Sequence, residues 1–447
     1  MRVTLTGLLF WLSLACSKGA SDPSAAAAGS APAEAPAPAP APSAIGADKA
    51  EARRPYNVLL VMIDSLRADM PWTGYEREIA PWLTSAQKSC VTYTQGYALS
   101  SYTAKSVAPA LVGEYPSAMK RDGLFFTTYP DEHNLFVSER VKKAGHRTLA
   151  GHAHGYFLPA LGNNQGFDDY QLIKGGVDIR AVTSVTSDKL SALAKQMLAD
   201  PKNVALRPGQ RFFAYFHYLD PHHTYVKHDG HPDFGPKARD LYDNEVHYTD
   251  QRLGELIDWT REQPWSKDTA LVITSDHGEG FGENNHFRHA YELWESLVKV
   301  PMIFCVPGAK PRRLEVRRSH IDLAPTLADL MGVRADPPFR GHSLVPEIFG
   351  AAVPARRIVV DLPRSDLMDR RRGVIEKDDK IIAFGDDRVF RLYDLAKDPW
   401  EKTDLSKTYP ERLERMKAIY LEESRKIPVV EVVGGAPLLG APAGQRW

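Results

Sequence analysis

The hydrophobic positions of this chain form several continuous runs rather than a strict alternation. Residues 57–63 read NVLLVMI and residues 270–274 read ALVIT. Strands that are apolar on both sides are typical of a parallel sheet covered by helices on both faces. Asp64 follows the first run, and Asp276-His277 follows the second. Either acid alone would also fit a helix cap. Because ligands gather at the carboxyl ends of such strands, two acids in the same position favour a shared divalent metal ion.

The remaining pattern alternates between strand and helix periods. Residues 212–216 form another short apolar run, and residues 245–260 carry apolar side chains at the spacing of one helix face. Beyond residue 304 we expect the chain to leave the central sheet. The final part predicts a small antiparallel sheet, with strands near 358–360, 373–375, 380–384 and 389–393 and a charged helix over 410–426.

The amino terminus predicts export and a membrane anchor. Residues 8–15 are apolar but too few to span a bilayer, and they end in LAC, which resembles a bacterial lipoprotein cleavage box with Cys16 as the lipidated residue. Ser17 is not an aspartate retention signal, so we expect an outer-membrane lipoprotein of the bacterial cell envelope with a periplasmic or surface-facing domain. Cleavage as an ordinary secretory signal, giving a secreted protein, stays open.

The domain boundaries follow from composition. We predict a signal peptide over residues 1–16, an Ala/Pro-rich disordered tether over 17–54, a catalytic domain over 55–350, a C-terminal subdomain over 351–430 and a tail over 431–447. A chain of this length can bury a large core.

Charge and cysteine content narrow the function only a little. The formal net charge is zero, so no basic surface points to nucleic acid, and an anionic substrate must be met by local groups. Cys90 and Cys305 lie beside apolar segments, and we expect two buried free thiols rather than a disulfide. The sequence carries no signal for the oligomeric state.

A series of short motifs extends the metal-site prediction to most of the chain. They are residues 63–69 (IDSLRAD), 74–75 with 80–83 (GY, APWL), 111–116 (LVGEYP), 220–222 (DPH), 275–279 (SDHGE), 322–327 (DLAPTL) and 392–395 with 398–399 (LYDL, DP). In this order and at these spacings, from about residue 57 to 418, the chain resembles the sulfatase family of the alkaline phosphatase superfamily. The resemblance implies an α/β/α sandwich with a mostly parallel central sheet, a small C-terminal antiparallel sheet with a helix, and hydrolysis of anionic esters.

The resemblance also locates the nucleophile. In the family it lies thirteen positions before the proline of a Gly-x-Tyr-Pro segment, which here points from Pro116 to Thr103. The sulfatase signature starts with Cys or Ser, has Pro two and Arg four positions later, and is oxidised to formylglycine. This chain has Lys105 and Val107 at those positions. Because threonine cannot become formylglycine, we expect no such cofactor here.

In having threonine at this position, the chain resembles the phosphoryl-transfer branches of the superfamily. These include phosphoethanolamine transferases, lipoteichoic-acid synthases and nucleotide pyrophosphatases. By that resemblance the metal ligands are Asp64, Thr103, Asp276 and His277. Ser65 replaces a second Asp that is common in sulfatases, and His277 stands where many calcium-binding members have Asn. Together they shift the expected ion from calcium toward manganese or zinc, while magnesium and a second ion stay open.

Other residues complete the predicted site. The resemblance makes His222 and His289 catalytic and substrate-binding residues, and His154 a substrate-binding residue; His152 lies near the same position. Lys105 would replace the missing arginine as a positive charge. As an alternative, Thr103 only caps its helix, and Ser101 or Ser106 is the nucleophile. The predicted site thus has a substrate-binding set (His154, His222 and His289), a nucleophile with its neighbouring positive charge (Thr103 and Lys105), and a metal-binding set (Asp64, Asp276 and His277).

Three functions follow from these residues. The first is a metal-dependent hydrolase of phosphate or phosphonate esters, or a phosphotransferase, that works through a covalent threonine intermediate. The second is a sulfuric ester hydrolase. The third is an inactive lipoprotein that keeps the fold for binding alone, which the intact set of acids, histidines and a hydroxyl disfavours.

Overall fold

The computed structural model describes residues 54–123, 127–130, 133–173, 185–352, 354–365, 367–430 and 432. Apart from residues 54 and 432, the predicted signal peptide, tether and tail, including Cys16, lie outside the described residues. Within these residues, no helix combines the length and the apolar character needed to cross a bilayer.

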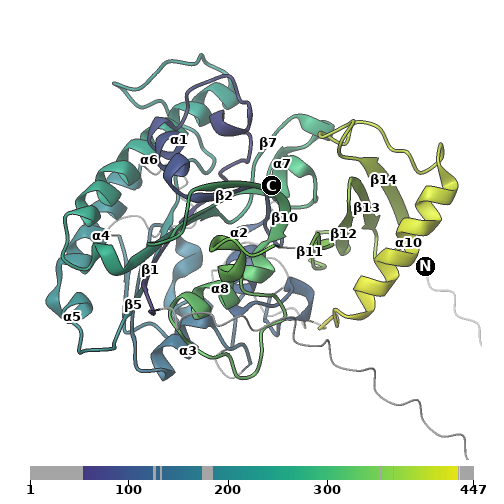
Figure 1. The fold of residues 1–447 in the computed structure, drawn as a ribbon. Coiled ribbons are helices and arrows are strands. Elements are labelled where there is room, and N and C mark those ends of the chain that lie inside the picture. The colour runs from purple at the N-terminus through teal and green to yellow at the C-terminus, as the bar shows by residue number, and fades with distance from the viewer. Residues whose placement is uncertain are drawn as a thin grey trace, which may run out of the picture. The chain divides into compact units, whose positions relative to one another are not determined.

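A sheet of eight strands forms the centre of the larger part, in the order β10-β2-β9-β6-β1-β5-β3-β4 (Figure 1). Its strands are β1 (Asn57–Ile63), β2 (Val91–Tyr97), β3 (Arg147–His152), β4 (Asp169–Leu172), β5 (Phe212–Tyr218), β6 (Thr269–Ser275), β9 (Lys299–Cys305) and β10 (Arg312–Ser319). All neighbouring strands are parallel except β9, which is antiparallel to β2 and β6. The mostly parallel sheet is as predicted.

Helices cover both faces of this sheet. The α-helices of the described residues are α1 (Pro81–Ala86), α2 (Thr103–Val112), α3 (Val137–Lys143), α4 (Ser187–Ala199), α5 (Pro201–Val204), α6 (Ala238–Arg261), α7 (Glu295–Val298), α8 (Leu323–Leu330), α9 (Val345–Ile348) and α10 (Pro410–Arg425), of which α10 belongs to the C-terminal part. Alternate residues of β1 belong to two separate cores. Leu60 packs with α2, α3 and α8, whereas Val61 packs with α1, α4 and α6. This explains why the β1 sequence is apolar without alternation.

A second sheet follows in the C-terminal part. Its four antiparallel strands are β11 (Ile358–Leu362), β12 (Arg371–Glu376), β13 (Asp379–Phe384) and β14 (Val389–Asp394), and α10 packs on them through Met416 and Tyr420. A small hairpin, β7 (Gly280–Phe281) and β8 (Phe287–Arg288), lies between β6 and β9 in the chain. The predicted small antiparallel sheet with its helix is confirmed.

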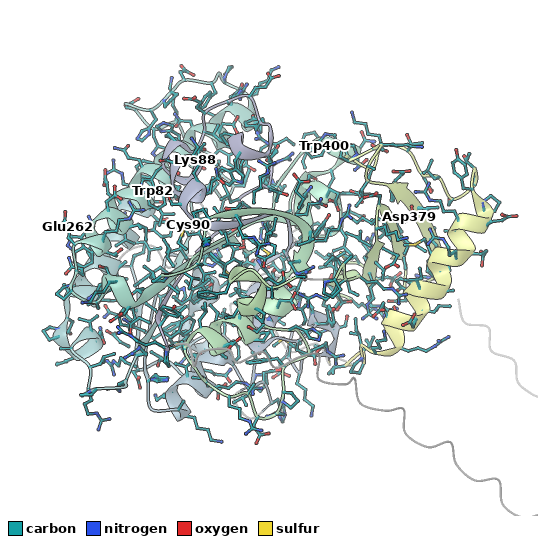
Figure 2. All side chains as sticks on the ribbon, viewed as in Figure 1. Trp82, Lys88, Cys90, Glu262, Asp379 and Trp400 are labelled. Carbon is teal, nitrogen blue, oxygen red and sulfur yellow. A yellow bond between two sulfur atoms is a disulfide. The ribbon has the colours of Figure 1, made fainter. Side chains whose placement is uncertain are left out.

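Two expectations about the central sheet are wrong. The chain does not leave the sheet after residue 304, because β10 returns to pair with β2 at the sheet edge. Its sequence, RRLEVRRS, is highly charged, as suits an edge strand that faces water. The two cysteines are not free thiols: Cys90 and Cys305 form a disulfide with Cα atoms 4.5 Å apart (Figure 2). The antiparallel pairing of β2 with β9 brings them together, since Val91 lies opposite Phe304.

Candidate active site

Polar side chains from three central strands lie close together at the carboxyl ends of those strands. β1 pairs with β5 on one side and β6 on the other, so the ends of the three strands are level. Asp64 directly follows β1, His217 is the penultimate residue of β5, and Asp276 directly follows β6. All three side chains are buried, with at most 1% of their surface exposed. The strand ends therefore form one enclosed cluster of two carboxylates and an imidazole.

This cluster fits a divalent metal ion. One ligand atom from each of Asp64, His217 and Asp276 lies within 4.8 Å of the other two, and no other such group of three occurs in the described part of the chain. His217 Nε2 lies 3.4 Å from Asp64 Oδ2 and 4.0 Å from Asp276 Oδ2. Asp276 Oδ2 is buried and has no hydrogen-bond partner among the described residues. A buried, unpaired carboxylate oxygen beside mixed oxygen and nitrogen donors is what a bound cation would satisfy.

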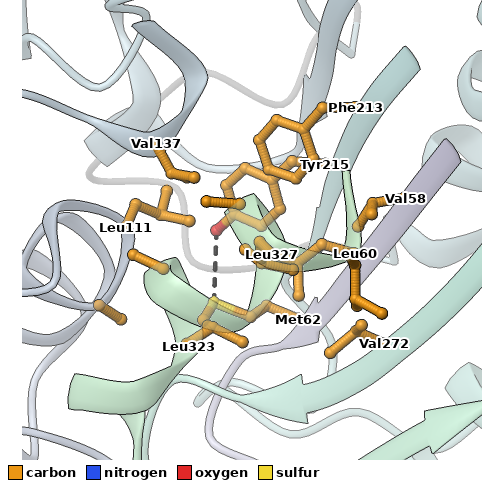
Figure 3. Packing of buried hydrophobic residues seen from close by; sticks show 14 of the residues in the cluster. Val58, Leu60, Met62, Leu111, Val137, Phe213, Tyr215, Val272, Leu323 and Leu327 are labelled. Carbon is orange, nitrogen blue, oxygen red and sulfur yellow. Dashed lines mark hydrogen bonds between the residues drawn. The ribbon is translucent and has the colours of Figure 1, made fainter. Parts of the chain in front are cut away.

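The second ring nitrogen of His217 has a polar contact of its own. Tyr215 Oη lies 2.8 Å from His217 Nδ1 and 3.5 Å from Met62 Sδ, and Figure 3 shows the contact with Met62. This leaves Nε2 as the nitrogen that faces Asp64. Histidines that bind a metal are commonly oriented through the second ring nitrogen in this way.

Thr103 faces the same cluster from the start of α2. Its hydroxyl Oγ1 lies 3.1 Å from His277 Nε2 and 3.4 Å from Asp64 Oδ2. His277 Nδ1 donates to the carbonyl of Gly278 at 2.9 Å, so Nε2 carries the lone pair. His277 Nε2 also lies 3.4 Å from Asp276 Oδ2. The hydroxyl therefore sits between two acceptors at a helix N-terminus, where free main-chain amides and the helix dipole favour an anion.

The other candidates on α2 and just before it have different surroundings. Lys105 is buried, and its Nζ donates to Thr127 Oγ1 at 3.0 Å. Ser101 Oγ and Ser106 Oγ each donate to a main-chain carbonyl at 2.5 Å. Since both serine hydroxyls are used in this way, Thr103 is the hydroxyl on this segment that is directed at the acids.

A row of histidines borders the cluster. The imidazole of His289 lies 4.5 Å from that of His277 and 4.9 Å from that of His222, between ring centres. The ring of His154 follows, 5.8 Å from His222. His289 Nδ1 lies 3.2 Å from each carboxylate oxygen of Glu279, which is fully buried. The structure thus brings His154, His222 and His289 together next to the acids.

Burial and charge separate these histidines into two kinds. Burial alone would lower the pKa of His289, but the carboxylate of Glu279 outweighs it and raises the pKa above the ordinary value. Burial lowers the pKa of His222, and it lowers the pKa of His154 to about 3. The surroundings therefore favour the charged form of His289 and the neutral forms of His222 and His154.

The two aspartates are also different from each other. Burial would raise the pKa of Asp64, but His222, His217 and His277 outweigh it and hold that pKa well below its usual range. Burial, together with the charge of Asp64, raises the pKa of Asp276. One carboxylate is thus stably ionised, and the second ionises only against repulsion, which a cation would remove.

Sequence reasoning missed two residues of this site. His217 lies within an apolar strand and reads as a core residue. Glu279 is part of the DHGE motif, but only its partner His289 was predicted. His152, named beside His154, is fully buried; it is level with His217 on the neighbouring strand, and its ring stacks on Phe157 at 4.2 Å. The sequence signal that could have identified His217 as a metal ligand is the spacing of two residues from Tyr215, which places both side chains on the same face of the strand.

Comparison with known proteins agrees with this fold. The sulfatase family model matches residues 56–333, and a model described as N-sulphoglucosamine sulphohydrolase, C-terminal, matches residues 282–425. The first match covers more than half of the chain. The chain therefore belongs to the sulfatase family, as the motifs indicated.

Individual relatives match over shorter stretches. A choline-sulfatase of Rhizobium meliloti is 33% identical over 117 residues, which is 26% of this chain and 23% of the relative. An arylsulfatase K of Xenopus laevis is 26% identical over 230 residues, 48% of this chain and 42% of the relative. The chain thus spans less than half of the length of these relatives.

Solved structures match over most of the chain. A 2-O GAG sulfatase has a TM-score of 0.69 at 17% identity and covers 83% of this chain and 92% of its own. A phosphonate monoester hydrolase from Silicibacter pomeroyi has a TM-score of 0.66 at 19% identity and covers 84% and 96%. These similarities show that the chain has the fold of the family, the alkaline-phosphatase-like sandwich predicted from the motifs.

Proposed function

We propose that this protein is a metal-dependent enzyme that cleaves phosphate or phosphonate esters, or transfers the phosphoryl group, through a covalent bond to Thr103. The observation that carries the proposal is the position of the Thr103 hydroxyl. It lies at the head of α2, 3.1 Å from His277 Nε2 and 3.4 Å from Asp64 Oδ2. A buried hydroxyl that faces two acceptors at a helix N-terminus is arranged as a nucleophile.

Asp64, His217, Asp276 and His277 would hold the divalent ion, with Thr103 Oγ1 beside them. Such an ion lowers the pKa of a hydroxyl and neutralises charge on an anionic ester. Manganese or zinc suits two carboxylates and two imidazoles better than calcium or magnesium, which prefer oxygen ligands alone.

The residues of the chain account for both steps of the reaction. Thr103 Oγ1 forms a bond to phosphorus while the P–O bond to the leaving group breaks, and Asp64 faces the hydroxyl to take its proton. His289, which Glu279 keeps as an imidazolium, gives a proton to the leaving oxygen. In the second step His289, now neutral, takes a proton from an attacking water or acceptor alcohol, and that oxygen forms a bond to phosphorus. The bond from phosphorus to Thr103 Oγ1 breaks, and Asp64 returns its proton to the Thr103 oxygen.

Sulfate ester hydrolysis is the alternative function. Membership of the sulfatase family and the sulfatases among its relatives support it. The residue at position 103 argues against it. A formylglycine hydrate expels sulfate by collapse through its second hydroxyl, whereas a threonine ester must be cleaved by attack at the central atom, which is easier at phosphorus than at sulfur.

The experiment compares an aryl phosphate diester, an aryl phosphonate monoester and an aryl sulfate that share one leaving group. We expect the phosphorus esters to be the better substrates of the metal-loaded protein. Thr103→Ala should reduce turnover by roughly 1000-fold or more, because the nucleophile is lost. Thr103→Ser should keep part of the activity because it preserves the hydroxyl. Ser101→Ala and Ser106→Ala remove the two neighbouring hydroxyls, each of which donates to a main-chain carbonyl, and either variant should lose less turnover than Thr103→Ala.

Several results would contradict this assignment. Formylglycine at Ser101 or Ser106 in a mass spectrum would restore the sulfatase mechanism. The same conclusion would follow if sulfate turnover survived in Thr103→Ala. Absence of turnover on all three esters, in protein shown to contain its metal, would favour a binding role for the fold.

We also propose that the substrate is met at the cell envelope. The LAC sequence that ends at Cys16 supports a lipid anchor, and the outer membrane is the expected location. Membrane fractionation of the wild type and of Cys16→Ala tests this. The wild type should sediment with membranes and the variant should be released; equal release of both would leave secretion as the better explanation.

A further inference from the structure

The segment that carries His289 has a strained main chain. Arg288, Ala290 and Tyr291 have φ angles of 67°, 67° and 61°, in the left-handed region that side chains with a Cβ atom rarely adopt. Three such residues within four positions persist only where surrounding contacts hold them. His289 lies among them and reaches Glu279 at 3.2 Å. The position of His289 therefore depends on whatever fixes this segment.

Part of the restraint comes from the loop that leads to Thr103. The amide of Ala290 donates to the carbonyl of Ser101 at 2.7 Å, and Ser101 Oγ donates to the carbonyl of Glu292 at 2.5 Å. Two bonds thus join the histidine segment to the residues just before the nucleophile. The distance between Thr103 and His289 is set through Ser101.

The other part comes from the C-terminal sheet. Lys380 on β13 is completely buried, and its Nζ donates to the carbonyl of Leu293 at 2.8 Å. The same amine forms ion pairs with Glu295 at 2.9 Å and with Glu401 at 2.8 Å. The amide of Glu295 in turn donates to Glu401 at 2.6 Å. Lys380 is therefore the centre of a buried network directly after the histidine segment.

Two further contacts extend this link. Arg371 on β12 donates from Nε to Glu292 Oε2 at 3.0 Å. The amide of Asp361 on β11 donates to the carbonyl of Leu99, four residues before Thr103. Apolar packing follows the same path, because Leu293 and Trp294 share one core with the C-terminal strands. The sheet thus contacts both the segment that carries His289 and the segment that carries Thr103.

We propose that the C-terminal sheet positions the active site, with Lys380 and Arg371 as positioning residues that hold the strained segment so that His289 stays in line with Thr103. The contacts given above join neither side chain to Asp64, Asp276 or His289. Lys380 acts through the carbonyl of Leu293 and through Glu295, and Arg371 acts through Glu292. The proposal rests on the proposed function, in which His289 moves a proton at the leaving oxygen. It assigns to the small sheet a role in catalysis beyond packing.

The test compares variants of these two residues in the full-length, metal-loaded protein. Arg371→Gln removes an ion pair near the surface, and Arg371→Lys retains the charge. Lys380→Met keeps the length of the side chain and removes its charge. Arg357→Gln is the matched control: Arg357 precedes β11 and forms ion pairs with Glu422 and Glu423, on the α10 side of the sheet. Should Lys380→Met fail to fold, Arg371→Gln tests the proposal alone.

Two measurements are made on each variant. Steady-state kinetics use the ester that the wild type cleaves best, and hydrogen exchange without substrate follows the peptide over residues 286–294. We expect kcat to fall about tenfold in Arg371→Gln, with KM changed less than about threefold and metal content unchanged. Exchange of that peptide should be faster, while peptides from β1 and β5 exchange as in the wild type. Arg371→Lys should recover most of kcat, and Arg357→Gln should match the wild type.

Several outcomes would contradict this proposal. Wild-type kcat in Arg371→Gln and in any folded Lys380→Met would overturn the proposal, as would slower turnover without faster exchange in residues 286–294, or the reverse. The exchange measurement is independent of substrate. It therefore separates a failure of this proposal from a failure of the proposed reaction, which would appear as absent turnover in the wild type.

Discussion

Asp276→Asn tests the central electrostatic feature of the site, two buried carboxylates that share one small space. In the wild type, Asp276 Oδ1 accepts from the amides of Ser65 at 3.2 Å and His277 at 2.9 Å, whereas Oδ2 has no partner among the described residues. Asparagine keeps the oxygen that accepts these bonds and replaces the unpaired oxygen with an amide. The substitution therefore removes the second negative charge with little change in shape.

The size of the effect follows from the separation of the charges. Ligand atoms of Asp64 and Asp276 lie within 4.8 Å of each other. At this distance two unit charges repel by about 3.5 kcal/mol if the effective dielectric constant is about 20. Because the pKa of Asp276 is raised, partial protonation relieves some of this repulsion. We expect Asp276→Asn to increase the free energy of unfolding of the chelated protein by roughly 1–3 kcal/mol.

When a metal ion is present, we expect the wild type to be more stable than Asp276→Asn. An ion at 100 times its Kd stabilises the folded wild type by about 2.7 kcal/mol, and the variant, with one ligand fewer, should gain much less. Urea unfolding with a chelator, and then with manganese or zinc, measures both effects. Asp361→Asn is the control, since Asp361 is buried and paired with Arg372 at 2.8 Å away from the site; it should destabilise equally in both conditions. Equal stability of the wild type and Asp276→Asn in chelator, or an equal gain from metal, would refute the reasoning.

Two further predictions concern stability. Cys90→Ala with Cys305→Ala should lower the free energy of unfolding by about 5 kcal/mol on a chain-entropy estimate, because the disulfide closes a loop of 215 residues; urea unfolding of this variant, and of the wild type with reductant, should agree. Asp250 accepts hydrogen bonds from the amides of Trp82 and Leu83 at 2.7 and 2.8 Å, yet burial raises its pKa from 3.8 to about 7. Since the folded pKa lies above the unfolded value, this contribution to stability is complete below about pH 4 and is lost as the pH rises through 7, by up to about 4 kcal/mol. Thermal unfolding across this range should show a smaller pH dependence in Asp250→Asn, and identical pH profiles would contradict the assignment.

The fold was predictable where the local pattern and the tertiary environment agree. β1 is apolar from Val58 to Ile63 because both of its faces are covered, and this is visible in the sequence. β10 failed as a prediction because an edge strand exposed to water can be charged, and a charged run reads as a loop. The disulfide failed for a different reason. Cys90 and Cys305 meet only because β2 and β9 are neighbours in the sheet, and no local pattern contains that pairing.

The site was predictable where a motif places residues at strand ends. Asp64, Asp276 and His277 directly follow apolar runs, so their position could be derived. His217 could not, because it lies inside β5 with apolar or aromatic neighbours, and a histidine in such a run is more often part of the core. Its role appears only when the strand register brings it level with the end of β1. Glu279 was missed for a different reason. It lies in the SDHGE motif, where Asp276 and His277 were already assigned as metal ligands, and no local pattern pairs it with His289.

The charges of the site narrow the class of ester that it suits. Asp64, Asp276 and Glu279 contribute three buried carboxylates, and His289 contributes one imidazolium. A divalent ion would bring this sum to zero, and the amine of Lys105, in the first turn of α2, would make it slightly positive. Such a site can neutralise one negative charge on the substrate but not two. Phosphate diesters and phosphonate monoesters carry one charge, as sulfate esters do, whereas phosphate monoesters carry two at neutral pH. We infer that a single charge is the property that this site selects, and that the residue at position 103 then decides between phosphorus and sulfur.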